Sequence, residues 1–145
     1  MAGKIVIVDY KAEHMLALQH TTGHSFIGTT MTAEEAVALE KARHSYTGLL
    51  DGKPVFCAGV SEYWPSRREA WAYMPAHTGA VMLQITRIVK RFFEVCDVER
   101  LEAPVYLDFE AGKRWVKILG FELETPLMRK YAPGGHDCAM YVKVK

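Results

Sequence analysis

The sequence is short of cysteine, of excess charge and of long apolar runs. Its three cysteines, Cys57, Cys96 and Cys138, are widely spaced and form no C-x-x-C pair. We therefore expect reduced thiols rather than disulfides or metal ligands. Lys and Arg number 18 and Asp and Glu 17, a net charge of +1. This balance argues against a global field that would attract nucleic acid or an anionic membrane.

Apolar runs long enough for a membrane span are also missing. The first run, residues 5–8, is cut by Asp9 and is too short for a signal peptide or a span. We therefore expect a protein kept inside a cell or packed into a particle assembled there.

What is present is an ordinary globular composition: half of the 145 residues are apolar and 24% are charged. A chain of this length can bury a core without disulfides. It shows no internal repeat, low-complexity tract or linker, so we expect one domain over residues 1–145.

Periodicity and turn signals predict the order strand, two helices, three strands, helix, strand, helix, two strands. Thr32 and Glu35 form a capping box that begins the second helix, and Asp51-Gly52 between two apolar runs predicts a hairpin. This order is typical of the α+β class. The predicted ranges are 5–8, 11–19, 33–44, 46–50, 53–60, 69–74, 80–95, 100–105, 110–119, 121–131 and 138–144.

Residues 114–122 carry the most informative pattern. Trp115, Ile118 and Leu119 have helical spacing, and Gly120 falls where a helix end favours positive φ. Phe121 opens a period-two pattern at once. The helix must therefore pass into a strand with almost no loop.

This Leu-Gly-Phe junction and the element order resemble the Gcn5-related N-acetyltransferase (GNAT) superfamily over nearly the whole chain. Residues 71–74, 114–121 and 128–137 also resemble the GNAT-like internal virion protein A type of short-tailed lytic bacteriophages. The resemblance implies a GNAT-like acyl-CoA N-acyltransferase fold, with a mixed, mostly antiparallel sheet flanked by helices. It also implies a phage-encoded N-acetyltransferase with an unknown amine acceptor, in the host cytoplasm or the virion.

Other functions stay open beside that reading. The chain could be an inactive member of the fold that acts in the phage particle or binds a host protein. It could also bind CoA without turnover, or form a homodimer.

The same resemblance implies acetyl-CoA as cosubstrate, in a cleft where two parallel strands part. The two strands would be the one ending at Met74 and the one around Leu101. The pyrophosphate would rest on amides that begin the long helix, where the helix dipole favours an anion. The implied cofactor-binding residues are Tyr73, Met74, His77, Thr78, Gly79, Ala80 and Val81.

Two positions depart from the superfamily pattern. The loop at residues 76–80 keeps one glycine and lacks the leading Arg or Gln, and Val116 stands where a tyrosine often protonates the leaving thiolate. Glu69 and Glu62 are the candidate bases for the amine proton, and Tyr131 and Tyr141 the candidate replacement acids. Alternatively, the two glutamates are solvated charges beside Arg67 and Arg68, and the two tyrosines are ordinary strand residues.

Basic side chains and histidines give weaker indications of a binding site. Arg87, Lys90 and Arg91 share one helix face, which either attracts CoA phosphates or an acidic partner, or is simply solvated. His20 and His24 have a ligand-like spacing, but Gly23 between them disfavours a helical pair, and we expect no metal site.

Overall fold

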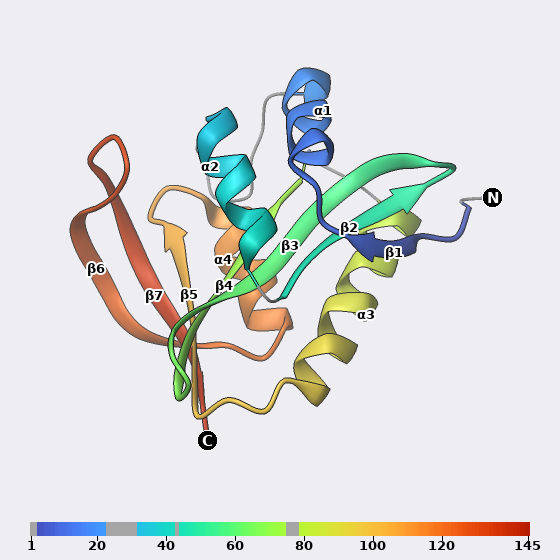
Figure 1. Ribbon diagram of the computed structural model, residues 1–145. Coiled ribbons are helices and arrows are strands. Elements are labelled where there is room, and N and C mark those ends of the chain that lie inside the picture. The colour runs from blue at the N-terminus through green and yellow to red at the C-terminus, as the bar shows by residue number, and fades with distance from the viewer. Residues whose placement is uncertain (1–2, 23–31, 43, 75–78) are drawn as a thin grey trace.

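The computed structural model describes residues 3–22, 32–42, 44–74 and 79–145. The predicted order of elements is confirmed (Figure 1). In chain order the elements are β1 (Val6–Asp9), α1 (Ala12–Thr22), α2 (Ala33–Ala38), the 3₁₀ turn η1 (Leu39–Lys41), β2 (His44–Leu50), β3 (Lys53–Trp64), β4 (Arg67–Tyr73), α3 (Gly79–Val95), β5 (Arg100–Tyr106), α4 (Glu110–Ile118), β6 (Glu122–Ala132) and β7 (His136–Val144).

The helix predicted over 33–44 is wrong at its end. It begins as predicted, because the Thr32 hydroxyl accepts the Glu35 N–H at 3.1 Å. It ends at Ala38, passes through η1, and gives way to β2 at His44. Pairing of β2 with β3 begins at His44, so tertiary strand pairing overrides the helix propensity of this alanine-rich segment.

Within the described residues, seven strands form one sheet in the order β1-β2-β3-β4-β5-β7-β6 (Figure 1). Neighbours pair antiparallel, except that β4 and β5 run parallel. This arrangement confirms the predicted α+β class and the mixed, mostly antiparallel sheet.

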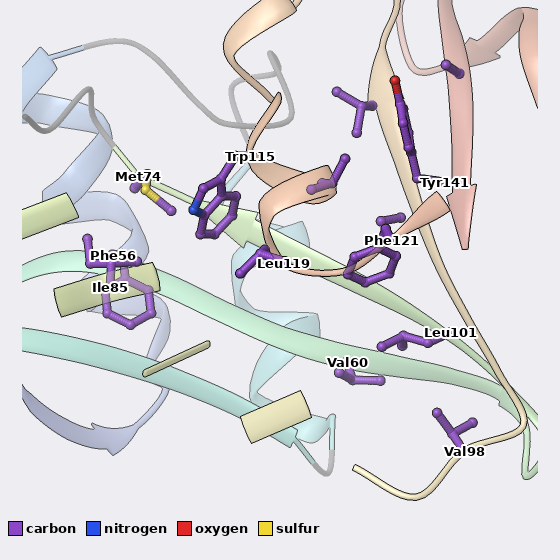
Figure 2. Packing of buried hydrophobic residues seen from close by; sticks show 14 of the residues in the cluster. Phe56, Val60, Met74, Ile85, Val98, Leu101, Trp115, Leu119, Phe121 and Tyr141 are labelled. Carbon is purple, nitrogen blue, oxygen red and sulfur yellow. The ribbon is translucent and has the colours of Figure 1, made fainter. Parts of the chain in front are cut away.

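Helices cover both faces of the sheet. Residues of α1 and α2 pack with Tyr10, Cys57 and Tyr73 in the smaller core cluster. Residues of α3 and α4 pack on the opposite face in the larger cluster, which includes Phe56, Ile85, Trp115, Leu119 and Phe121 (Figure 2). Side chains alternate along β4, so each of its faces serves a different cluster.

Two glycine-dependent turns form as predicted. Asp51 and Gly52 have φ of 52° and 78°, the positive values that a two-residue type I′ hairpin requires. Gly120 has φ of 97°, and the N–H groups of Gly120 and Phe121 donate to the carbonyls of Lys117 and Val116. This is a Schellman motif, and it turns α4 directly into β6.

None of the helices within the described ranges combines the length and the hydropathy needed to cross a bilayer.

Gly59 is the position in β3 where an added methyl group is least tolerable. A Cβ there would lie 2.2 Å from the His44 carbonyl oxygen and 2.9 Å from the Trp71 ring. Gly59→Ala should therefore push β2 or β4 away and lower the free energy of unfolding by about 1–3 kcal/mol. Urea unfolding measures the change.

The matched control for Gly59→Ala is Gly52→Ala. A Cβ at Gly52 meets no atom within 4 Å, but the residue has positive φ. Its expected cost is conformational alone, about 1 kcal/mol. A cost at Gly59 no larger than that at Gly52 would contradict the predicted clash.

Candidate active site

The parallel strands β4 and β5 part in the middle of the sheet. Their described pairs are Arg67–Arg100, Arg68–Leu101 and Glu69–Glu102, and the ladder ends there. Both strands continue, to Tyr73 and Tyr106 respectively. The inner edges of the two strands beyond Glu69 and Glu102 therefore border an opening, which we call the opening below.

A cavity of about 230 Å³ lies at the opening and extends between the sheet and helices α3 and α4. Both strands contribute to its wall, β4 through Ala70 and Ala72 and β5 through Ala103 and Val105. These small side chains leave the opening unfilled. Trp115, Leu119 and Phe121 line the α4 side (Figure 2). Among the described residues that line the cavity, none is charged.

A charged cluster marks the point where the strands part. The Glu102 carboxylate is almost fully buried and accepts Nε–H bonds from Arg67 at 2.9 Å and Arg100 at 2.7 Å. Arg67 donates a second bond to Glu102 at 3.0 Å, and Arg100 also binds Glu124 at 2.8 Å. Burial acts to raise the pKa of Glu102, but the two guanidinium groups outweigh it and hold that pKa below its ordinary value. Glu102 is therefore a structural anion rather than a proton acceptor.

Glu69 lies beside Glu102 on the last rung of the ladder and has a different environment. Burial is the largest cause that raises its pKa, and the charge of Glu102 adds to it. The Tyr63 hydroxyl donates a hydrogen bond to Glu69, which with the charge of Arg67 offsets part of the rise. A carboxylate with a raised pKa is closer to the value that a general base needs near neutral pH.

Tyr131 of β6 shares the electrostatic environment of Glu69. Burial raises the pKa of Tyr131 first, and the negative charges of Glu69 and Glu102 raise it further. Tyr131 is 43% exposed. The fold thus brings the two predicted catalytic side chains into one neighbourhood.

The raised pKa limits what Tyr131 can do. An ordinary thiol has a pKa of about 8.5, while the pKa of Tyr131 lies above 10.0. Proton transfer from Tyr131 to a thiolate would therefore be uphill, whereas donation of a hydrogen bond would not.

The predicted cofactor-binding residues fall into three groups. Tyr73 and Met74, at the end of β4, are 3% and 2% exposed and pack in opposite core clusters, so their side chains are committed to the core. Gly79 and Ala80 begin α3 and are exposed, and Val81 packs against the larger cluster. His77 and Thr78 lie outside the described residues.

The start of α3 is suited to an anion. Gly79 has φ of 61°, a value that favours glycine. The first turn of α3, all of it described, carries no acidic residue. The first N–H groups of a helix lack partners within the helix, and its dipole is positive at this end.

The cluster around Glu102 was not predicted from the sequence. One signal was available, because Glu102 is a lone carboxylate in the apolar run 101–105, and a buried charge needs a partner. The identity of its partners depends on the register of β4 against β5, which no local pattern encodes. The link between Tyr63 and Glu69 was missed for the same kind of reason, since it spans the hairpin of β3 and β4.

Comparison with known proteins shows the fold. No protein-family model and no curated protein matches the sequence. An N-acetyltransferase from Staphylococcus aureus Mu50 superposes with a TM-score of 0.80 at 10% identity, over 98% of each chain. A GNAT-family acetyltransferase from Bacillus anthracis gives 0.69 at 15% identity, over 99% of this chain and 96% of that one.

A third similar structure holds a ligand. It is YncA from Salmonella typhimurium, solved with its cofactor acetyl-CoA, with a TM-score of 0.66 at 16% identity, over 98% of this chain and 94% of that one. At such identities the likeness shows the fold alone. This chain has the α+β GNAT acyl-CoA N-acyltransferase fold.

Proposed function

We propose that this single domain is an acetyl-CoA-dependent N-acetyltransferase that acts on an amine. The observation that carries the proposal is the opening between β4 and β5, whose walls leave a cavity unfilled. α3 begins a few residues after the end of β4, so its N-terminus lies near the carboxyl end of a strand that borders the opening. Open sheets commonly bind ligands at such a place.

Three segments of the chain would bind different parts of acetyl-CoA. The first amides of α3, at Ala80 and Val81 with Gly79 as the turn, would hold the pyrophosphate of acetyl-CoA. Unpaired backbone of β4 near Tyr73 and Met74 would face the pantetheine arm, since an exposed strand edge binds extended amides. His77 and Thr78 would complete the phosphate loop.

The chemical step is acyl transfer with Glu69 as base. The amine nitrogen attacks the thioester carbonyl carbon, and Glu69 takes the amine proton, directly or through a water. The carbon–sulfur bond then breaks, and the departing thiolate accepts a hydrogen bond from Tyr131 and a proton from solvent. Alignment of the amine and the thioester supplies the remaining acceleration.

A second candidate is a catalytically inactive GNAT-fold protein of a phage particle. Val116 favours it, since this residue is buried, apolar and lines the cavity, and has no proton to give. The resemblance of residues 114–121 and 128–137 to phage internal virion proteins supports phage origin. Mass spectrometry of purified particles tests it: presence in the particle, together with no affinity for acetyl-CoA, would favour this candidate over the enzyme.

Ala80→Pro is the substitution that tests the phosphate site. Proline fits the first position of a helix after its cap, and removes only the N–H of Ala80. We expect acetyl-CoA to bind about ten- to a hundredfold more weakly by calorimetry, because a hydrogen bond to a charged group contributes about 1.5–3 kcal/mol.

Ala33→Pro is the matched control, since Ala33 is exposed and follows the cap of α2. It should leave affinity for acetyl-CoA unchanged. If the wild-type protein did not bind acetyl-CoA at millimolar concentration, the proposal that it is an enzyme would be contradicted.

A further inference from the structure

A groove on the surface between the N-terminal segment and α3 adjoins the cavity. Its lining includes Lys4, Arg87 and Arg91 together with apolar side chains. The groove and the cavity share three lining residues, Ile7, Ile88 and Phe92. These three side chains therefore lie between the groove and the cavity.

Gln84 of α3 builds one wall of the groove. Its Oε1 accepts the Ile5 N–H at 3.0 Å, and its Nε2 donates to the Gly3 carbonyl at 2.7 Å. Both ends of the amide are thus used to fix residues 3–5 beside α3. The backbone of Lys4 is held between these two bonds, on the rim of the groove.

The rim has charge of one sign. Lys4, Arg87 and Arg91 are exposed, and no acidic residue lines the groove in the described part of the chain. Across the described ranges, none of the three forms an ion pair. Guanidinium groups bind carboxylates with paired hydrogen bonds, so the rim suits an anionic head group.

The cavity, unlike the basic rim of the groove, is apolar. The cavity is partly open to solvent, measures about 230 Å³ and has an apolar lining. An apolar cavity of about 150 Å³ engineered in another protein stays dry and binds benzene. A space of this kind, next to a basic rim, suits an aliphatic chain that carries one anionic group.

We propose that the groove and the cavity together bind a long-chain carboxylate of the fatty-acid class. The carboxylate lies at Lys4, Arg87 and Arg91, and the chain passes Ile7 and Phe92 into the cavity. The cavity is the one at the opening between β4 and β5, so the aliphatic chain shares that space with the proposed function. The head-group site at Lys4, Arg87 and Arg91 is distinct from Glu69 and from the start of α3, and dodecanoate binding without acetyl-CoA binding would support this proposal alone.

Calorimetry with dodecanoate, below the concentration at which it forms micelles, tests the head-group site. We expect micromolar binding to the wild-type protein and at least a tenfold loss in the double variant Arg87→Gln/Arg91→Gln. Lys90→Gln removes one positive charge from an exposed position of α3 outside the groove, and should leave binding unchanged. Equal binding of neutral dodecanol would overturn the carboxylate assignment.

The chain path is tested by filling it. Ala58 lines the cavity, so Ala58→Leu should weaken dodecanoate binding at least tenfold and hexanoate binding less. Ala111→Leu, the same change at an exposed position of α4, is the control and should change neither.

Three further outcomes would overturn the proposal. The first is absence of dodecanoate binding to the wild-type protein. The second is binding to anionic phospholipid vesicles but not to monomeric dodecanoate, which would mark the rim as a membrane contact. The third is binding of dodecanoyl-CoA but not of dodecanoate, which would assign the cavity to the acyl chain of a thioester donor.

Discussion

Glu69→Gln should lower kcat for acyl transfer by about 10²- to 10⁴-fold, the usual contribution of a general base. The substitution keeps the size of the side chain and an oxygen that can accept the Tyr63 hydrogen bond, but the amide cannot take the proton of the amine. Affinity for acetyl-CoA should be unchanged, because Glu69 lies at the parting of the strands rather than at the start of α3. Thiol release with a panel of amines, alongside calorimetry with acetyl-CoA, measures both effects.

Glu62→Gln is the matched control. Glu62 is an exposed carboxylate on the neighbouring strand, paired with Arg68 at 3.2 Å, and its loss should leave kcat within twofold of wild type. If the two variants lost activity equally, Glu69 would not be the base.

The pH profile gives a second, independent test of Glu69. A base works when deprotonated, so kcat/KM should fall as the pH drops through the pKa of Glu69, which lies above the ordinary value of 4.5. Tyr63→Phe removes the hydrogen bond that lowers this pKa, and should therefore move the acidic limb of the profile to higher pH. An acidic limb that stays in place would show that another group controls it.

Most of the fold could be predicted because its signals are local. The capping box at Thr32, the Asp51-Gly52 turn and the Gly120 helix end are each determined by a few neighbouring residues. The turn and the helix end form as expected, and of the capping box the bond from the Glu35 N–H to the Thr32 hydroxyl forms. The end of α2 could not be predicted, since β2 is extended by its pairing with β3 from His44 onward, and that pairing is a long-range contact.

Less of the candidate site could be predicted from the sequence. Its parts come from strands far apart in the chain, and the contact between Arg67 and Glu102 joins residues 35 positions apart. The resemblance to GNAT proteins supplied Glu69 and Tyr131 as candidates, but not the burial and the neighbouring charges that raise the pKa of each. The cavity was equally hidden, because small residues such as Ala70 and Ala103 give no signal until their strands are placed side by side.

Trp115→Ala should lower the free energy of unfolding by about 3–5 kcal/mol, as is usual for a buried tryptophan. Trp115 is 8% exposed and packs in the larger core cluster, where it joins α4 to α3. Its indole N–H donates to the Thr86 hydroxyl at 2.9 Å, which in turn donates to the Met82 carbonyl at 2.8 Å. Urea unfolding followed by circular dichroism measures the loss.

Trp115→Phe separates packing from hydrogen bonding. Phenylalanine keeps an aromatic ring against the core but cannot donate to Thr86, so its expected cost is only about 1 kcal/mol from the lost bond, plus the smaller ring volume. The Thr86 hydroxyl keeps its bond to Met82. If Trp115→Ala cost no more than Trp115→Phe, the indole would fill little space. The wall between α4 and the cavity would then be held by Leu119 and Phe121 instead.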